Sequence, residues 1–337
     1  MSKKNILVFV LLLAAFAVSF LALTLDMFSA EPPPRIYNIS MIVRGKSSDR
    51  WESIRQGADQ AAGEMNVDLR FVTLSDEDDA EEQMEVLRRE YENGVDAVLL
   101  SAADSLRLVK PVEEIAAHVP VVCIESPVAS ASVASYIAAD NYDMGVRLAQ
   151  QVVFSGNSRR NIAVVLNTSV HNAAVQERYD GLMSVFSALG VTPEVWDLPG
   201  EPVADAERMA GLLSGGGTDV LVALDLPVLE LTAQAASDAS AAAAAAAQAA
   251  GRTFPEDYLE VFGVGSTGRI ASFIEQEVIL ATVAQNDFAI GYLGVKAAVD
   301  TLEKRPVEKS VTVEHRAINR ENMYELDNQR LLFPFIR

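Results

Sequence analysis

Side chains able to bind a small polar molecule stand where several short apolar runs of this sequence end. Glu125 directly follows one such run, Asp225 and Gln285 follow two later ones, and Trp51 lies shortly after the first. Carboxylates and amides hydrogen-bond to hydroxyl groups, while an indole covers the C–H face of a ring. This set of groups predicts the binding of a hydroxyl-rich ligand such as a sugar.

The first of these positions is a loop, residues 46–50, that leads into Trp51. Asp49 and Arg50 place one carboxylate and one planar guanidinium beside the indole. Together they offer an apolar surface bracketed by charged hydrogen-bonding groups, an arrangement that suits sugars. The alternative is that Trp51 only packs beneath the loop.

Three of the remaining candidates, Glu125, Asp140 and Arg178, also have an ordinary structural explanation. Glu125 could be a turn residue, and Asp140, which precedes a predicted helix, could be only its N-cap. Arg178 lies one turn inside a predicted helix, where most arginines are solvated. Asp225 and Gln285 follow apolar runs, and the amide of Gln285 could join a ligand to a crossover between two lobes.

A glycine-rich turn suggests a competing chemistry. Residues 263–268 match the pattern G-x-G-x-x-G of dinucleotide-binding proteins and lie between a predicted strand and a predicted helix. The turn lies in the last third of the chain, and Gln285 stands where an acid is expected after the next strand, so both features argue against a nucleotide site. A nucleotide-dependent enzyme that uses this turn stays as an alternative function.

Other catalytic and metal-binding signatures do not stand out in the sequence. His118, His171 and His315 are dispersed, without the spacing of metal ligands. The acidic run 76–82 lacks the glycine of a calcium loop and indicates a solvated helix start. No Gly-x-Ser-x-Gly nucleophile motif occurs. We therefore expect a protein that is not an enzyme, with no cofactor and no bound metal.

The elements that must position the candidate residues alternate between short β-branched runs and longer amphipathic ones, which indicates βαβ units and a mostly parallel sheet. Gly94, Gly190 and Gly251 stand where predicted helices end, as left-handed C-caps require. The alanine-rich run 235–250 predicts a further helix. Two series of strands predict two doubly wound lobes in an α/β protein. The predicted strands are 36–43, 69–74, 97–100, 119–124, 133–137, 162–166, 192–196, 220–223, 258–264 and 280–284, and the predicted helices include 51–65, 81–93, 142–153, 175–189 and 205–213.

The N-terminal segment predicts a membrane anchor. Residues 6–25 form a run without any charged residue. A run of this length is long enough for a helix to cross the hydrocarbon core. Lys3 and Lys4 favour an N-terminus in the cytoplasm and a body on the extracytoplasmic side. A cleavable signal peptide ending at Ala30 is the alternative, but the apolar run is long and Phe28 is bulky for that cleavage site. A lipoprotein anchor is excluded because no cysteine stands near the boundary.

Composition limits the possible partners. The chain has 27 basic and 47 acidic residues among 337, a formal net charge of −20, which argues against nucleic acid or anionic lipid as a partner. Its single cysteine, Cys123, lies inside an apolar run, so it is expected to be a core residue without a disulfide.

Six phrases, taken in order, resemble the ribose-binding-protein-like group of type I periplasmic binding proteins, which share their fold with the effector domains of lactose-repressor-type regulators. The likeness runs from about residue 36 to residue 300. No helix-turn-helix precedes it, so a repressor is excluded. The phrases are SIRQGA (53–58), NGVDAVLLS (93–101), PVVCIE (120–125), ADN (139–141), ERYDG (177–181) and ATVAQ (281–285).

The resemblance implies two Rossmann-like lobes that are joined by a three-strand hinge and close over a small ligand, usually a sugar. It places the binding aromatic on Trp51, the acid of the fourth strand on Glu125, the second-lobe arginine on Arg178 and the crossover glutamine on Gln285. Asp225 stands where the family has an asparagine. The usual acid after the following strand is missing, because the turn 265–266 holds Gly-Ser. These two departures put pentose binding in doubt.

The resemblance also implies a membrane partner, either an ATP-driven (ABC) sugar importer or a sensor histidine kinase. The tail 318–335 is similar to that of membrane-tethered members associated with such kinases. A degenerate binding fold kept as a protein-interaction module is a further alternative. We expect a membrane anchor over 1–30, a proline-rich spacer over 31–35, a first lobe over 36–139 and 286–312, and a second lobe over 140–285 and 313–337.

Overall fold

The computed structural model describes residues 3–28, 35–46, 51–156, 160–166, 171–253 and 259–333. It divides into two compact units, Met1–Ile36 and Tyr37–Arg337. The first unit contains the helix α1 (Lys3–Phe28). Its segment Lys4–Leu21 is long and apolar enough to cross a membrane, and no residue of this segment is buried. A helix that is apolar on all sides has no water-facing surface of its own. Most of the predicted spacer, residues 31–34, lies outside the described residues.

The second unit, the body, is built on two six-stranded sheets within its described residues. We call each sheet with its helices a lobe. Lobe 1 has the strand order β11 (Ser310–Val313), β5 (Ser135–Ala139), β4 (Val121–Ile124), β3 (Ala97–Leu100), β1 (Tyr37–Ile42) and β2 (Val67–Val72). Lobe 2 has the order β12 (His315–Asn319), β10 (Ile279–Gln285), β9 (Glu260–Val264), β8 (Val220–Ala223), β6 (Ile162–Leu166) and β7 (Glu194–Asp197). Every pairing is parallel except that of β10 with β12.

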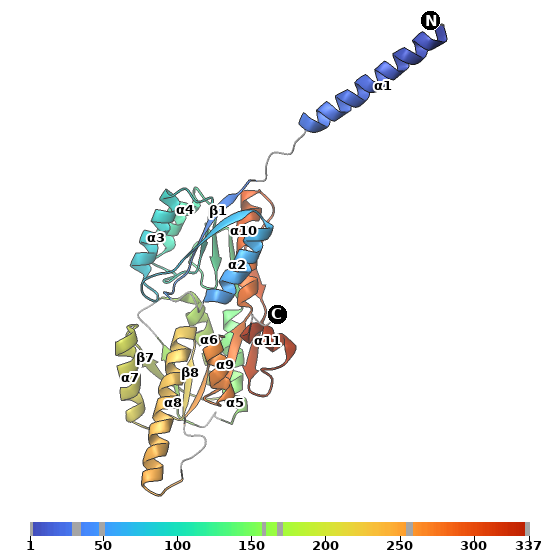
Figure 1. Ribbon diagram of the computed structural model, residues 1–337. Coiled ribbons are helices and arrows are strands. Elements are labelled where there is room, and N and C mark those ends of the chain that lie inside the picture. The colour runs from blue at the N-terminus through green and yellow to red at the C-terminus, as the bar shows by residue number, and fades with distance from the viewer. Residues whose placement is uncertain are drawn as a thin grey trace. The chain divides into compact units, whose positions relative to one another are not determined.

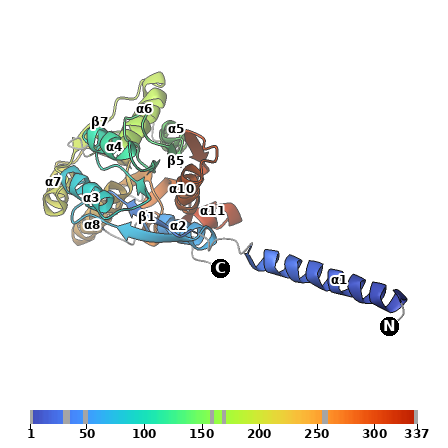
Figure 2. The same cartoon turned by 90° about the horizontal axis from the view of Figure 1, so that it is seen from above.

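Helices cover both faces of each sheet, which makes both lobes doubly wound. In Figures 1 and 2, α3 (Ala80–Glu92) and α4 (Val109–Ala116) lie on one side of the lobe 1 strands, and α2 (Glu52–Glu64) and α10 (Asp287–Leu302) on the other. In lobe 2, α5 (Asn141–Phe154) packs against α6 (Ala173–Ala188). There α8 (Leu226–Ala249) packs against α7 (Pro202–Ser214) and α9 (Gly268–Glu275), and α11 (Leu326–Leu332) contacts β10.

The chain crosses between the two lobes three times. It leaves β5 to enter α5, leaves β10 to enter α10, and passes from β11 to β12 through the single residue Glu314. The amide of Asn286, which precedes α10, donates to the carbonyl of Glu314 at 2.9 Å. Two of the crossings are therefore tied together, as the predicted three-strand hinge requires.

Glycines let one helix pair in each lobe approach closely. A Cβ at Gly57 of α2 would lie 1.9 Å from the carbonyl oxygen of Phe288 in α10, and one at Gly145 of α5 would lie 1.9 Å from the carbonyl oxygen of Arg178 in α6. Gly291 and Gly181 are packed just as tightly on the opposite helices. These contacts fix the position of α6, which carries Arg178, and of α10, which begins at Asp287.

The two doubly wound lobes predicted from the sequence are confirmed. Gly94, Gly190 and Gly251 adopt the expected left-handed conformation, with φ values of 82°, 71° and 63°. The alanine-rich helix begins earlier than expected, at Leu226, because the apolar residues that precede the alanines pack against β8 and β9. The predicted strand 69–74 is shifted to 67–72, where it pairs with all of β1.

Candidate functional site

A cavity lies where the carboxyl ends of the strands of both lobes meet, the place where open α/β sheets bind ligands. Its volume is about 50 Å³. Lobe 1 supplies residues that follow β1, β2 and β4, and lobe 2 supplies residues from α6 and from the ends of β8, β9 and β10. The lining residues are Arg44, Trp51, Ile54, Glu77, Glu125, Arg178, Asp225, Leu226, Pro227, Val264, Gly265, Ser266, Val283, Gln285 and Asp287.

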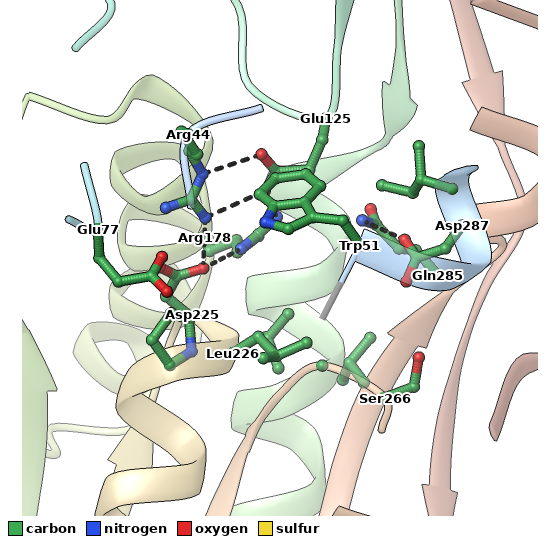
Figure 3. A pocket seen from close by; sticks show the side chains of 15 residues that line it. Arg44, Trp51, Glu77, Glu125, Arg178, Asp225, Leu226, Ser266, Gln285 and Asp287 are labelled. Atoms are coloured by element: carbon green, nitrogen blue, oxygen red, sulfur yellow. Dashed lines mark hydrogen bonds and ion pairs between the residues drawn. The ribbon is translucent and has the colours of Figure 1, made fainter. Parts of the chain in front are cut away.

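Arg44, two residues after β1, is the centre of an ion-pair network (Figure 3). Its guanidinium contacts Asp78 at 2.8 Å and Glu125 at 3.1 Å within lobe 1, and Asp225 of lobe 2 at 2.8 Å. Figure 3 shows the contacts with Glu125 and Asp225. Arg44 is only 4% exposed, so these contacts are strong and nearly shielded from water. The contact with Asp225 joins the two lobes across the cavity.

Burial and charge act differently on the partners of Arg44. Burial raises the pKa of Asp78 to about 7, although Arg44 lies beside it. Burial would also raise the pKa of Asp225, but Arg44 and Arg178 outweigh it and hold the pKa below its ordinary value. Asp225 is therefore the carboxylate that the two arginines keep charged.

Glu125 is held in a strained conformation at the end of β4. Its φ of 59° lies in the left-handed region, which a residue with a side chain rarely adopts. The hydroxyl of Ser101 donates to its carboxylate at 2.8 Å, and Arg178 approaches that carboxylate to 3.6 Å. The hydroxyl of Tyr136 donates to its carbonyl oxygen at 3.0 Å. Strain of this kind persists only where surrounding contacts compensate it, and it clusters at functional sites.

Arg178 lies on α6 and is only 2% exposed. Its Nε donates to Asn141 at 2.8 Å, and its Nη1 donates to the carbonyl of Leu224 at 3.1 Å. The amide nitrogen of Asn141 in turn donates to Tyr136 at 3.2 Å. Both ends of the Asn141 amide are thus occupied, so this residue holds Arg178 in place.

Gln285 and Asp287 line the cavity at the second crossing, where β10 leads into α10. The Nε2 of Gln285 donates to the carboxylate of Asp287 at 2.9 Å, as Figure 3 shows. The Oε1 of Gln285 is buried and accepts no hydrogen bond from any described residue. Burial raises the pKa of Asp287 to about 7, and the nearby charge of Glu125 adds to the rise.

Trp51 directly precedes α2 and is only 8% exposed. Trp51 belongs to the hydrophobic core and also lines the cavity. Both interpretations of this residue, packing beneath the loop and facing a ligand, therefore apply to it. The Arg44 guanidinium lies 5.9 Å from the centre of its ring. Gly45 makes room for the indole, because a Cβ there would lie 2.5 Å from the indole nitrogen.

The structure brings together Trp51, Glu125, Arg178, Asp225 and Gln285, all proposed from the sequence, around one cavity. Asp49 and Arg50 lie outside the described residues. Asp140 is exposed and does not line the cavity; its carboxylate caps α5 by accepting from the amide of Asp143 at 2.9 Å.

Several residues of the site were not predicted from the sequence, above all Arg44, Asp78 and Asp287. Asp78 belongs to the acidic run that was expected to be a solvated helix start, and that interpretation fits Asp79, which caps α3, but not Asp78. Asp78 turns inward because its own amide donates to the carbonyl of Arg44 at 2.8 Å. The position of Arg44 just after an apolar run was a signal that could have identified it.

A second cavity of about 440 Å³ adjoins the first. Asp225 lines both, so the Arg44 network lies at their boundary. Asn172 lines the second cavity and is only 6% exposed, and its Nδ2 has no partner among the described residues. Ligand sites usually span about 300–1,000 Å³. The first cavity is smaller than this because the protein's own side chains, including the Arg44–Asp225 pair, fill much of the gap.

Packing accounts for two of the three glycines of the turn 263–268. A Cβ at Gly263 would lie 2.5 Å from the side chain of Leu229, and one at Gly265 would lie 3.1 Å from the side chain of Leu226. Gly265 also has a φ of 138°. Nothing lies within 4 Å of a Cβ at Gly268. Thr267 caps α9 by accepting from the amide of Ile270. Gly263 and Gly265 are therefore needed for packing against α8, and neither requires a phosphate. No group of acids, histidines and cysteines able to hold a metal occurs among the described residues.

Two doubly wound lobes, three crossings and a cavity between the lobes define a two-lobed ligand-binding protein. The family described as "periplasmic binding protein domain" matches residues 39–306, most of the chain, and the chain belongs to this family. The family is one of binding proteins, and its members' domains work on the extracytoplasmic side of the membrane. No curated protein matches the chain.

Solved structures share this fold at low identity. A carbohydrate-transporter solute-binding protein from Agrobacterium radiobacter, in complex with D-arabinose, is 21% identical with a TM-score of 0.77, covering 88% of this chain and 98% of that one. An ABC-transporter solute-binding protein from Agrobacterium vitis with bound D-fucose is 20% identical with a TM-score of 0.74, covering 88% and 100%. The fructose-binding periplasmic domain of a hybrid two-component system is 22% identical with a TM-score of 0.72, covering 87% and 94%.

Proposed function

We propose that the body is a receptor that closes its two lobes over a sugar or polyol. The observation that carries this proposal is the convergence of Trp51, Glu125, Arg178, Asp225 and Gln285, from both lobes, on one cavity. An indole beside carboxylate, guanidinium and amide groups suits a hydroxylated ring. The bound D-arabinose and D-fucose of the similar structures support a ligand of this class.

The Arg44–Asp225 contact suggests how binding and closure are coupled. This ion pair bridges the lobes directly. A ligand enters when the lobes part, and its hydroxyl groups then hydrogen-bond to the carboxylates and guanidinium groups that had faced each other. Because a ligand shifts an equilibrium only by its differential affinity, contacts to both lobes are what would favour the closed form.

We propose that a membrane partner detects this closure and that the protein itself is not an enzyme. The candidates are an ABC importer, as in the solute-binding relatives, and a sensor kinase, as in the two-component relative. In this proposal α1 is a single-pass anchor, residues 36–139 and 286–312 move as one lobe, and residues 140–285 and 313–337 move as the other.

A thermal-shift screen tests the receptor function. Arabinose, fucose, tagatose, fructose and several polyols are added to the purified protein. A ligand at 100 times its dissociation constant adds about 2.7 kcal/mol of stability. Trp51→Leu should weaken that shift, while Trp196→Leu should not, because Trp196 is equally buried in the lobe 2 core away from the cavity. The absence of any shift with every sugar and polyol would contradict the proposal.

A further inference from the structure

Among the described residues that line the cavity between the lobes, carboxylates outnumber cations. Glu77, Glu125, Asp225 and Asp287 line it, against Arg44 and Arg178. Asp78, which contacts Arg44, adds a further carboxylate just behind this lining. With these groups ionised, the site has an excess of negative charge, and no lysine lines the cavity among the described residues.

Both arginines are already committed to protein groups. Arg44 contacts three carboxylates at 2.8 to 3.1 Å. Arg178 donates to Asn141 and Leu224 and lies 3.6 to 3.8 Å from Glu125 and Asp225. Neither guanidinium is therefore available to balance a further charge at the opposite end of the cavity without giving up contacts it already makes.

The opposite end, formed by Gln285 and Asp287, offers acceptors. Figure 3 shows this pair on one side of the Trp51 indole and the arginine network on the other. One N–H of the Gln285 amide donates to Asp287, and the buried Oε1 of the same amide has no partner among the described residues. A buried acceptor of this kind is costly unless something donates to it. The missing partner is therefore a donor, and the adjacent carboxylate favours one that carries a positive charge.

We propose that the ligand is an amino sugar or amino polyol whose protonated amine is bound by Gln285 and Asp287, with its hydroxyl groups facing the arginine network. This inference rests on the proposed receptor function and names the ligand class for the same cavity. An ammonium group has three donors, enough for both acceptors. The face of Trp51 lies within the same cavity and attracts cations as well.

The raised pKa of Asp287 supports the same inference. Burial and Glu125 raise it, while Gln285 and Arg178 lower it, and the balance is about 7. The described residues around Asp287 do not supply enough positive charge to keep this acid ionised. A ligand cation would do so, and its binding near pH 6 would release a proton from Asp287. An anionic sugar would meet the unbalanced carboxylates, and a neutral one would leave them as they are.

Matched ligand sets test the inference. Glucose, glucosamine, N-acetylglucosamine and glucuronate, and the corresponding galactose set, are titrated against the full-length protein in detergent by thermal shift and calorimetry. At least one amine should bind ten or more times tighter than its parent, its N-acetyl derivative and its uronate. Asp287→Asn should remove that preference. Asp59→Asn, an exposed acid on α2, should retain it.

A measurement on the unmodified protein keeps the test independent of how the variants fold. At pH 6 the binding enthalpy of the amine should depend on the ionisation enthalpy of the buffer, which indicates proton release. Tighter binding of neutral sugars or uronates, or no buffer dependence, would overturn the inference while the receptor function stands. If no member of any set binds, and the neutral sugars and polyols screened above do not bind either, both proposals fail.

Discussion

The first two crossings between the lobes place different residues at equivalent positions. Where β5 leads into α5, the first helical residue is Asn141, and both ends of its amide are hydrogen-bonded. Where β10 leads into α10, the first helical residue is Asp287, whose carboxylate accepts a hydrogen bond from Gln285. The first crossing holds Arg178 as part of the frame. The second presents acceptors to the cavity, and this difference shows which side of the hinge is left to a ligand.

The surrounding frame is the same in both lobes. Each crossing begins a helix, α5 or α10, that meets its neighbour through a pair of glycines whose Cβ positions would strike backbone atoms. The strand orders also correspond, apart from the antiparallel β12. The lobes therefore share their packing and differ in the polar groups that this packing presents.

The largest loss of stability should come from removing Arg44, the centre of the ion-pair network. Arg44→Met leaves Asp78, Glu125 and Asp225 without their shared cation. Breaking a buried ion pair in this way costs about 3–5 kcal/mol, and chemical denaturation at pH 7 should show it. Arg147→Met, which removes an exposed pair on α5, should cost less than about 0.5 kcal/mol. Equal losses of stability in the two variants would mean that the Arg44 network does not hold the two lobes together.

Next come the glycine contacts common to both lobes. Gly145→Ala and Gly291→Ala each force a methyl group against a backbone carbonyl oxygen, and overpacking of this kind costs about 1–3 kcal/mol. Gly63→Ala on α2 is the control, because nothing lies within 4 Å of its Cβ position. That variant should be neutral or slightly stabilising. Similar losses in both lobes would support a shared frame, whereas a loss in one alone would contradict it.

Asn141→Ala tests the satisfied crossing directly. It leaves the Nε of Arg178 without its acceptor and removes one of the two hydrogen bonds of the Tyr136 hydroxyl, which still donates to the carbonyl of Glu125. This loss should cost about 1–3 kcal/mol. Denaturant unfolding measures the loss. Asn141→Asp keeps an acceptor for Arg178 and should lose less, so a loss as large as that of the alanine variant would argue against this role.

Asp287→Asn should stabilise the protein at high pH, whereas the substitutions above destabilise it. Because burial raises the pKa of Asp287 from 3.8 to about 7, the folded protein keeps a proton that the unfolded chain has already released. Stability from this group is therefore present at low pH and is lost as the pH rises from about 4 to about 7. Without a ligand, the variant should be more stable than the wild type at pH 8, by roughly 1–2 kcal/mol, and equal to it at pH 4. Melting curves at the two pH values test this.

The smallest effect is expected at Asp140. Its carboxylate caps α5 and is exposed, so Asp140→Ala should cost about 0.5–1 kcal/mol and leave ligand affinity unchanged. Asp140→Ser should recover most of the stability, because serine also caps helices well. A loss of ligand binding in either variant would show that Asp140 contributes to the binding site.

The sequence was sufficient for the fold and for part of the site. Glu125, Asp225 and Gln285 could be proposed because each stands at or just after the end of a strand, and strand ends converge in any doubly wound lobe. Arg44 and Asp78 could not be paired from the sequence, since their contact depends on how two loops turn. Asp78 itself has a φ of 56°, a local choice that the acidic run does not indicate. Asp287 was assigned only to a helix start, because nothing local shows that its environment lacks water.

The one-residue link between β11 and β12 restricts how the protein can move. Glu314 spans at most about 3.6 Å, and its carbonyl is fastened to the neighbouring strand connection at Asn286. Sliding of one half past the other is therefore excluded, and bending about an axis through these connections remains. Probes attached across the mouth would separate widely on opening, whereas probes beside Glu314 would stay at constant spacing.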